Sequence, residues 1–96
     1  MKLDFSVEAR LDLFAAQDHY ESERDGLGQE FIAEMYALAE KVALMPLGFP
    51  VISPDARRAL AKRFPYMLVF FVLDDAVRIV AVLHQHQHPD TWRNRG

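Results

Sequence analysis

The sequence predicts a single α+β domain, in which an amino-terminal strand and an antiparallel helical hairpin pack on a small antiparallel β-sheet. Three observations predict this fold. Residues 2–7 alternate between polar and apolar side chains, residues 9–45 carry apolar side chains at helical spacing with glycines between them, and residues 66–84 hold two strongly apolar segments. A chain of 96 residues has the length of one compact domain, so we expect residues 1–96 to form that domain.

Residues 2–7 predict a short strand that leads directly into a helix. Leu3, Phe5 and Val7 would face one side of this strand. Ser6 can accept a hydrogen bond from a backbone N–H, so we expect it to cap the start of the helix. The apolar face of the helix is expected to comprise Ala9, Leu13, Ala16 and Tyr20.

A second helix is expected after a turn that contains glycine. Gly26 and Gly28 can adopt positive φ, so we expect them to end the first helix after the polar run 21–25. Pro46 is expected to end the second helix, because a proline pushes the preceding residue out of the helical region. Two helices joined by so short a turn pack as an antiparallel hairpin. The apolar face of the second helix is expected to comprise Phe31, Met35, Leu38, Val42 and Met45.

The carboxyl-terminal half predicts an antiparallel meander. The glycine, prolines, serine and aspartate of residues 48–55 are typical of a connecting loop. Residues 57–64 are compatible with a basic strand. Residues 66–73 and 77–84 are rich in β-branched and aromatic side chains, and the acidic pair at 74–75 predicts a tight turn between them.

The two firmly predicted strands carry apolar side chains on both faces, whereas an antiparallel sheet usually exposes one face to water. One face is expected to present Tyr66, Leu68, Phe70, Val72, Ile79, Ala81 and Leu83. The other is expected to present Met67, Val69, Phe71, Leu73, Val80 and Val82, beside Arg78 and His84. A helical hairpin can cover only one face. We therefore expect a protein partner on the second face, with the alternative that the carboxyl-terminal tail folds back and Trp92 covers it.

Composition and charge restrict the function classes. The chain has no cysteine, which excludes disulfides, thiolate metal sites and a cysteine nucleophile. It has no apolar run long enough to span a membrane, so we expect no membrane partner. Residues 1–56 hold 4 basic and 11 acidic residues, a net −7, whereas residues 57–96 hold 7 basic and 3 acidic residues, a net +4. This asymmetry predicts an anionic partner for the second half, or simply a well-solvated acidic helical half.

Two groups of side chains could carry chemistry. His84, His86 and His88 would share one face of an extended strand, as metal-binding histidines do, but Asp90 is the only carboxylate nearby. We therefore expect polar surface residues there, with no metal and no cofactor. A second group could bind phosphate and support RNA cleavage, or could simply solvate a strand: it comprises Arg58, Lys62, Arg63, Tyr66 and His84.

Three motifs carry a resemblance to a known family. They are Glu21…Arg24-Asp25-Gly26-Leu27-Gly28…Phe31, then Arg57-Arg58…Arg63-Phe64-Pro65-Tyr66, and finally Val80-Ala81-Val82-Leu83-His84…Pro89…Trp92-Arg93. From about residue 3 to 95 the chain resembles the ParE branch of the RelE/ParE toxin superfamily. The resemblance implies a helical hairpin on an antiparallel sheet, and a small toxin that a cognate antitoxin holds inactive.

The resemblance also implies a target and partners. ParE-like toxins inhibit DNA gyrase, whereas RelE-like relatives cleave mRNA on the ribosome. We expect a cytoplasmic gyrase inhibitor that is not an enzyme and forms a hetero-oligomer with a ParD-like ribbon-helix-helix antitoxin, with no sequence-specific DNA binding by this chain itself. The alternatives are an endoribonuclease and a non-toxic relative that only binds its antitoxin. Where the family commonly has arginines, this chain has His86, Gln87 and His88, which lowers the charge of the tail.

Two sets of site residues follow. The residues expected to bind the antitoxin are Met67, Val69, Phe71, Val80, Val82 and Trp92. The residues expected to contact the target are Arg58, Lys62, Arg63, His84, His86 and Arg93.

Overall fold

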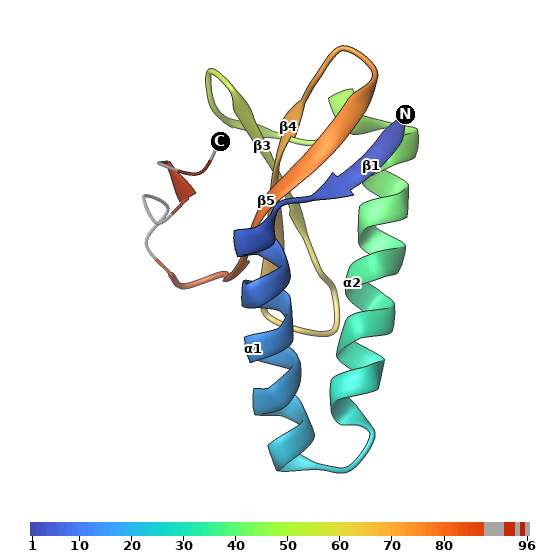
Figure 1. The fold of residues 1–96 in the computed structure, drawn as a ribbon, viewed down its shortest axis with the longest axis vertical. Helices are drawn as coiled ribbons and strands as arrows, with labels where there is room; N and C mark the ends of the chain where they lie inside the picture. The colour runs from blue at the N-terminus through green and yellow to red at the C-terminus, as the bar shows by residue number, and fades with distance from the viewer. Residues whose placement is uncertain (88–91, 94, 96) are drawn as a thin grey trace.

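A helical hairpin lies against one face of a five-stranded sheet (Figure 1). The computed structural model describes residues 1–87, 92, 93 and 95. The elements in chain order are β1 (Lys2–Phe5), α1 (Val7–Glu23), α2 (Leu27–Leu44), the 3-10 helix η1 (Pro46–Gly48), β2 (Val51–Ser53), β3 (Ala56–Leu60), β4 (Tyr66–Val72) and β5 (Ala76–His84). The order of strands in the sheet is β1-β5-β4-β3-β2. The α+β class and the helical hairpin are therefore confirmed.

The sheet is mixed rather than purely antiparallel. The strands β2 to β5 form an antiparallel meander, but β1 pairs with β5 in parallel, with Leu3 opposite Val77. Parallel pairing is possible here because the long connection between β1 and β5, which comprises both helices and the strands β2 to β4, returns the chain to the same end of the sheet. The short strand β2 lies in the segment predicted as a loop, where Pro50 and Pro54 flank it and Val51 pairs with Arg57 of β3.

Local capping interactions define the helical hairpin. The Ser6 hydroxyl accepts a hydrogen bond from the Ala9 N–H at 3.1 Å, so the predicted cap of α1 is confirmed. In the turn, Gly26 has a φ of 87°. The Glu21 carboxylate accepts hydrogen bonds from the N–H groups of Gly26 at 2.9 Å and Gly28 at 3.0 Å. These bonds satisfy two backbone donors that a helix start would otherwise leave unpaired.

The helices bury the faces that their periodicity predicts, with one exception. The side chains of Ala9, Leu13, Ala16, Phe31, Met35 and Val42 are buried. Met45 was expected to continue the buried face of α2, but 69% of it is exposed. The reason is that α2 ends at Leu44, and Met45 leaves the helix with φ −142° and ψ 63°.

A β-bulge in β5 changes which side chains lie beneath the helices. Phe70 pairs with Ile79 and Val69 with Ala81, so Val80 is an extra residue on β5. An extra residue reverses the alternation of side chains beyond it. Val82 therefore packs in the core under the helices, whereas Ala81 and Leu83 pack on the opposite face. The face assignments expected for Ala81, Val82 and Leu83 are wrong for this reason.

Candidate partner-binding surfaces

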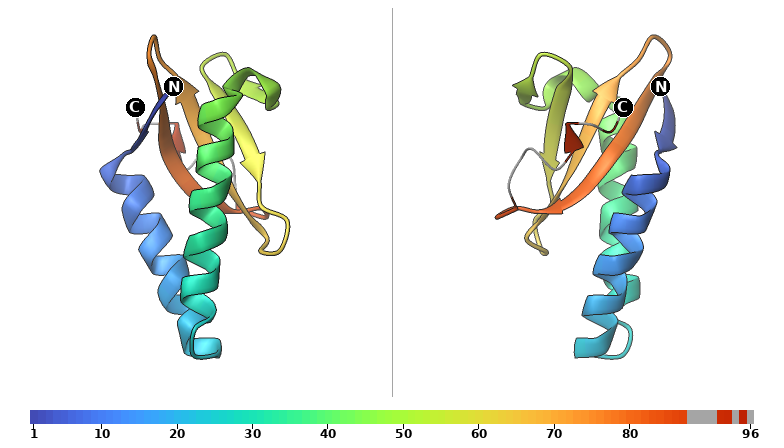
Figure 2. Two further views of the ribbon diagram at one scale, coloured as in Figure 1. Left: turned by 90° about the vertical axis from the view of Figure 1, so that its right-hand side faces the viewer. Right: turned by 60° about the vertical axis from the view of Figure 1, so that its left-hand side comes forward.

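The chain's own tail covers much of the second face of the sheet. Trp92 is only 4% exposed and packs in a cluster with Met67, Val69 and Val80. The Phe71 and Trp92 rings meet edge to face, with centroids 6.2 Å apart. Figure 2 shows this part of the tail (red) on the side of the sheet away from α2. The alternative, in which the tail folds back and Trp92 covers this face, is therefore confirmed for this cluster, and binding of a partner to the same face stays a prediction.

An ion pair holds the end of the tail against α1. The Arg95 guanidinium pairs with the Asp12 carboxylate, and these side chains are 22% and 20% exposed. Arg95 also donates to the Val80 carbonyl at 3.3 Å. Asp12 in turn accepts a hydrogen bond from the Val82 N–H at 3.0 Å. The tail, α1 and the bulged part of β5 are thus joined in one polar network.

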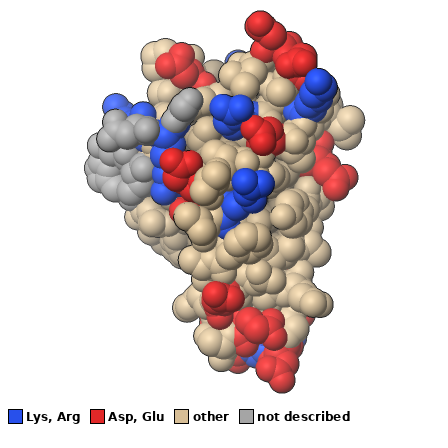
Figure 3. Space-filling view, in the orientation of Figure 1, with Lys and Arg blue, Asp and Glu red and all other residues tan. Residues whose placement is uncertain are grey.

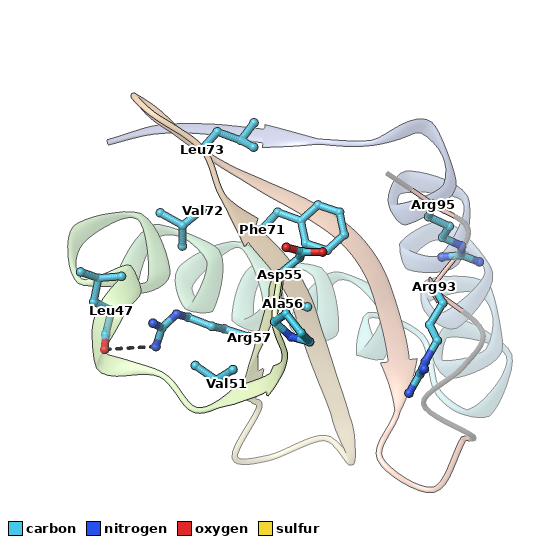
Figure 4. Close-up of a pocket in the computed structure, with 11 residues that line it drawn as sticks. Leu47, Val51, Asp55, Ala56, Arg57, Phe71, Val72, Leu73, Arg93 and Arg95 are labelled. Carbon is cyan, nitrogen blue, oxygen red and sulfur yellow. Dashed lines mark hydrogen bonds between the residues drawn. The ribbon is translucent and has the colours of Figure 1, made fainter.

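A groove of about 570 Å³ remains beside the tail. Figure 4 shows Phe71 near its centre and Leu47 on the far side from the tail. The Arg57 guanidinium donates to the carbonyls of Phe49 at 2.7 Å and Leu47 at 3.4 Å, which fixes η1 against β3. The groove is lined by Leu47, Val51, Pro54, Asp55, Ala56, Arg57, Phe71, Val72, Leu73, Arg93 and Arg95.

Exposed apolar side chains extend this groove around the end of α2. Leu44 is 80% exposed, Leu47 71%, Val51 56% and Leu73 41%. A second hollow, of about 660 Å³, shares Leu47 and Leu73 with the first and also contacts Met45. We call the exposed residues Leu44, Met45, Leu47, Val51 and Leu73 the apolar rim. Sequence reasoning missed most of this rim, although the apolar residues at 44, 45 and 47, around the end of the helix, were a signal that could have found it.

The cations expected to contact a target do not form one cluster. Arg63 pairs with Glu30 of α2 and lies over the Phe64 ring, 5.1 Å from its centroid. The N–H groups of Lys62 and Arg63 both donate to the Glu34 carboxylate. Arg58 instead lines a hollow on the second face of the sheet, and Arg93 lines the groove beside the tail.

Acidic side chains gather at the end of the molecule where the two helices meet (Figure 3). Most of the visible Lys and Arg side chains lie toward the other end, among further carboxylates. The Arg63 and Arg24 guanidiniums both hydrogen-bond Glu30, and this holds the pKa of the Glu30 carboxyl below its ordinary value.

Two histidines of the carboxyl-terminal run, His84 and His86, lie at the end of β5 and in the turn just after it. The ring of His84 lies 5.3 Å from that of Tyr66 and 5.1 Å from that of His86. The His86 N–H donates to His84 Nδ1 at 3.1 Å. Burial raises the pKa of the Tyr66 hydroxyl. His88 lies outside the described residues, and within the described part of the chain no three His, Asp or Glu side chains are placed to hold a metal ion.

Comparison with known proteins decides the family. The model of a family described as the ParE toxin of the type II toxin-antitoxin system parDE matches residues 3–89. The chain belongs to the ParE toxin family. A solved structure described as the chromosomal ParDE TA system from P. aeruginosa has a TM-score of 0.76 to this chain at 20% identity, covering 88% of this chain and 95% of that one. No curated protein matches.

The first of the three sequence motifs lies at the glycine turn between the two helices. In this ParE chain, Glu21, Gly26 and Gly28 of the first motif hold the helical turn together. That motif is therefore structural. A ParE toxin of a type II system implies an antitoxin partner. Among the described residues, no helix is long and apolar enough to cross a membrane.

Proposed function

We propose that this ParE-family chain is a cytoplasmic toxin that inhibits DNA gyrase and that a ParD-like ribbon-helix-helix antitoxin neutralises by forming a hetero-oligomer with it. The observation that carries the proposal is the family match over residues 3–89. The shared fold with a ParDE system supports it. The apolar groove supports it further, because exposed apolar surface of this extent is typical of protein interfaces.

The antitoxin is proposed to bind first along Phe71 and the apolar rim. These residues are accessible without any movement of the tail, and an interface core built from large apolar side chains is the usual source of affinity. Arg57, Arg93 and Arg95 border the same groove. A segment that combines apolar anchors with acidic residues therefore fits this site best.

The remaining proposed antitoxin contacts lie in the cluster that contains Trp92. Val69 and Val80 are fully buried in the same cluster as Trp92, so an antitoxin would reach them only if this cluster opened. Met67 also lines a separate hollow with Arg58 and Gln85, so it borders a surface that Trp92 does not line. Val82 faces the helices and is no longer part of the proposed surface.

For the target, we propose two groups of polar side chains. Lys62 and Arg63 lie in the β3–β4 loop, and His84 and His86 lie at the end of β5. Arg58 and Arg93 belong to the sheet face and the tail, so they would contact a different part of a large target such as gyrase.

A supercoiling assay with purified components tests the proposed function. The chain alone is expected to inhibit gyrase at micromolar concentration, and its antitoxin is expected to restore activity. Unchanged supercoiling would contradict the gyrase target. If codon-specific mRNA cuts appeared instead, and vanished in Arg63→Ala, the endoribonuclease alternative would replace it. Harmless expression without the antitoxin would favour the non-toxic alternative.

A further inference from the structure

The helix α1 carries large apolar side chains on the face that is turned away from the core. Val7 is 62% exposed, Leu11 63% and Phe14 48%. Their spacing of four and then three residues places them on one side of the helix, which we call the outer face of α1. Of the three residues that α1 buries, two are the small Ala9 and Ala16. The exposed face of this helix therefore holds more apolar bulk than the buried one.

The proposed antitoxin surface does not account for this outer face. Figure 1 shows α2 and the sheet on one side of α1, and the outer residues are left accessible in the described part of the chain. None of the three lines the groove beside Phe71 or the hollow beside Met45. An exposed apolar stripe along a helix is typical of a face that packs against another helix.

Two charged side chains stand at equal distances from Phe14. Arg10 precedes it by four residues and Asp18 follows it by four, so each lies about 6 Å away along the helix axis. Both are exposed, and among the described residues neither forms an ion pair. Within α1, no residue of opposite charge lies three or four positions from either of them, so the helix itself cannot pair them.

This arrangement of side chains is complementary to itself. In a symmetric antiparallel pair of helices with the two-fold axis beside Phe14, each residue before Phe14 faces the residue equally far after it in the second copy. The two Phe14 rings would then pack together, and Arg10 of each copy would meet Asp18 of the other. A second copy of the chain thus supplies both the apolar contact and the opposite charges that α1 lacks.

We propose that the free chain forms a symmetric homodimer through the outer face of α1. The interface of a single helix pair is small, so the dimer is weak, with a dissociation constant on the order of 10 μM. No residue of α1 lines the groove beside Phe71. Self-association and the proposed antitoxin binding therefore use different surfaces, and the dimer does not depend on the proposed function.

Sedimentation equilibrium of the purified chain with exchanged charges tests the proposal. Arg10→Asp places a carboxylate opposite Asp18 in both pairs, and Asp18→Arg places a guanidinium opposite Arg10. Each variant is expected to weaken association roughly tenfold, because like charges then face each other across the interface. The double variant restores both pairs with reversed polarity, so its dissociation constant is expected to return to within about threefold of the parent value.

Two further variants complete the test. Lys41→Asp makes the same change in net charge as Arg10→Asp at an exposed position of α2, and its dissociation constant is expected to stay within about twofold of the parent value. Phe14→Asp is expected to give a monomer that keeps the parent circular dichroism spectrum. A parent chain that stays monomeric at several hundred micromolar, on the order of ten times the expected constant or more, would overturn the proposal. A dimer that Phe14→Asp leaves intact, or that the double variant fails to restore, would overturn it as well.

Discussion

At the scale of single residues, Trp92 determines how much of the sheet is exposed. Its ring covers the cluster that contains Met67 and Val69, but its indole Nε1 is buried and has no hydrogen-bond acceptor among the described residues. A buried donor without an acceptor costs about 1–3 kcal/mol. The ring therefore stabilises the fold through apolar contact, while its polar atom opposes that gain.

This balance predicts different outcomes for two substitutions. Trp92→Ala is expected to lower the free energy of unfolding by roughly 3 kcal/mol, because it removes a buried ring. Trp92→Phe is expected to stay within about 1 kcal/mol of the parent chain, because the lost contact is offset by removal of the unpaired N–H. Denaturant unfolding followed by circular dichroism measures both. A larger loss for Phe than for Ala would contradict this account.

Trp92 also offers a direct probe of the tail. It is the only tryptophan of the chain, so the intrinsic emission reports on this ring alone. We expect blue-shifted emission from the free chain. Emission typical of an exposed indole in the folded state would show that the tail does not cover the sheet.

Gly28 is a second residue whose identity the fold requires. A Cβ at this position would lie 2.8 Å from the Gln17 carbonyl oxygen and 2.9 Å from Glu21 Oε1. Gly28→Ala is therefore expected to destabilise the chain by about 1–3 kcal/mol, because the backbone of α1 must move. The control is Gly48→Ala, whose Cβ would meet only Met45 Cβ at 4.0 Å. Thermal unfolding of the two variants is expected to separate them clearly, and equal midpoints would contradict the close approach of the two helices.

At the scale of elements, carboxylates of α2 hold the β3–β4 loop. Glu34 accepts the N–H groups of Lys62 and Arg63, and Glu30 pairs with the side chains of Arg24 and Arg63. The helix α2 thereby contacts both the turn before it, through Arg24, and the β3–β4 loop. The hydrogen bond from the Arg63 N–H to Glu34 joins residues that are 29 positions apart in the sequence. The basic strand end predicted from the sequence is thus partly neutralised by the acidic helix.

The Glu30 pairing predicts a pH dependence of stability. Hydrogen bonds from Arg63 and then Arg24 lower the pKa of Glu30 in the folded chain below its ordinary value of 4.5. When the pKa of a carboxyl group is lower in the folded chain than in the unfolded chain, the charged group stabilises the fold at pH values above its pKa in the unfolded chain. This stabilisation is lost as the pH falls through the pKa of the group in the folded chain. Glu30→Gln is therefore expected to be less stable than the parent chain at pH 7, with the difference vanishing in strong acid.

The free energy of unfolding measured between pH 7 and pH 2 checks this expectation. Glu40→Gln, at an exposed position of the same helix, is the control and is expected to match the parent chain closely. A stability difference for Glu30→Gln that persists unchanged at low pH would argue against the ion pair as its source.

At the scale of the whole molecule, separate parts of the chain build the proposed antitoxin surface. The end of α2 contributes Leu44, and Met45 follows it. η1 contributes Leu47, β2 contributes Val51, and the end of β4 contributes Phe71 and, just beyond it, Leu73. Each of these side chains is only partly covered in the folded chain. Their joint exposure is what makes this end of the molecule the best site for a partner.

A charge placed in this surface is expected to weaken antitoxin binding strongly. Phe71→Asp and Leu73→Asp should each weaken binding by a few kcal/mol, because an unpaired carboxylate would be buried in the interface. Leu73 is 41% exposed, so Leu73→Asp is expected to fold and can test the surface even if Phe71→Asp does not fold. Phe14→Asp changes an aromatic side chain that is 48% exposed on α1, outside the groove, and serves as the control. Calorimetric titration with the antitoxin measures all three, and unchanged affinity of Leu73→Asp would contradict the proposed surface.

The sequence by itself determined the elements whose signals are local. The Ser6 cap, the glycine turn, the end of α2 before Pro46 and the hairpin of β4 and β5 all follow from neighbouring residues, and the motifs identified the family. Only the tertiary structure decided the parallel pairing of β1, the bulge at Val80, the covering of the sheet by Trp92 and the groove around Phe71. Each of these depends on contacts between segments that are far apart in the chain. Local periodicity carries no information about which distant segments pair or pack together.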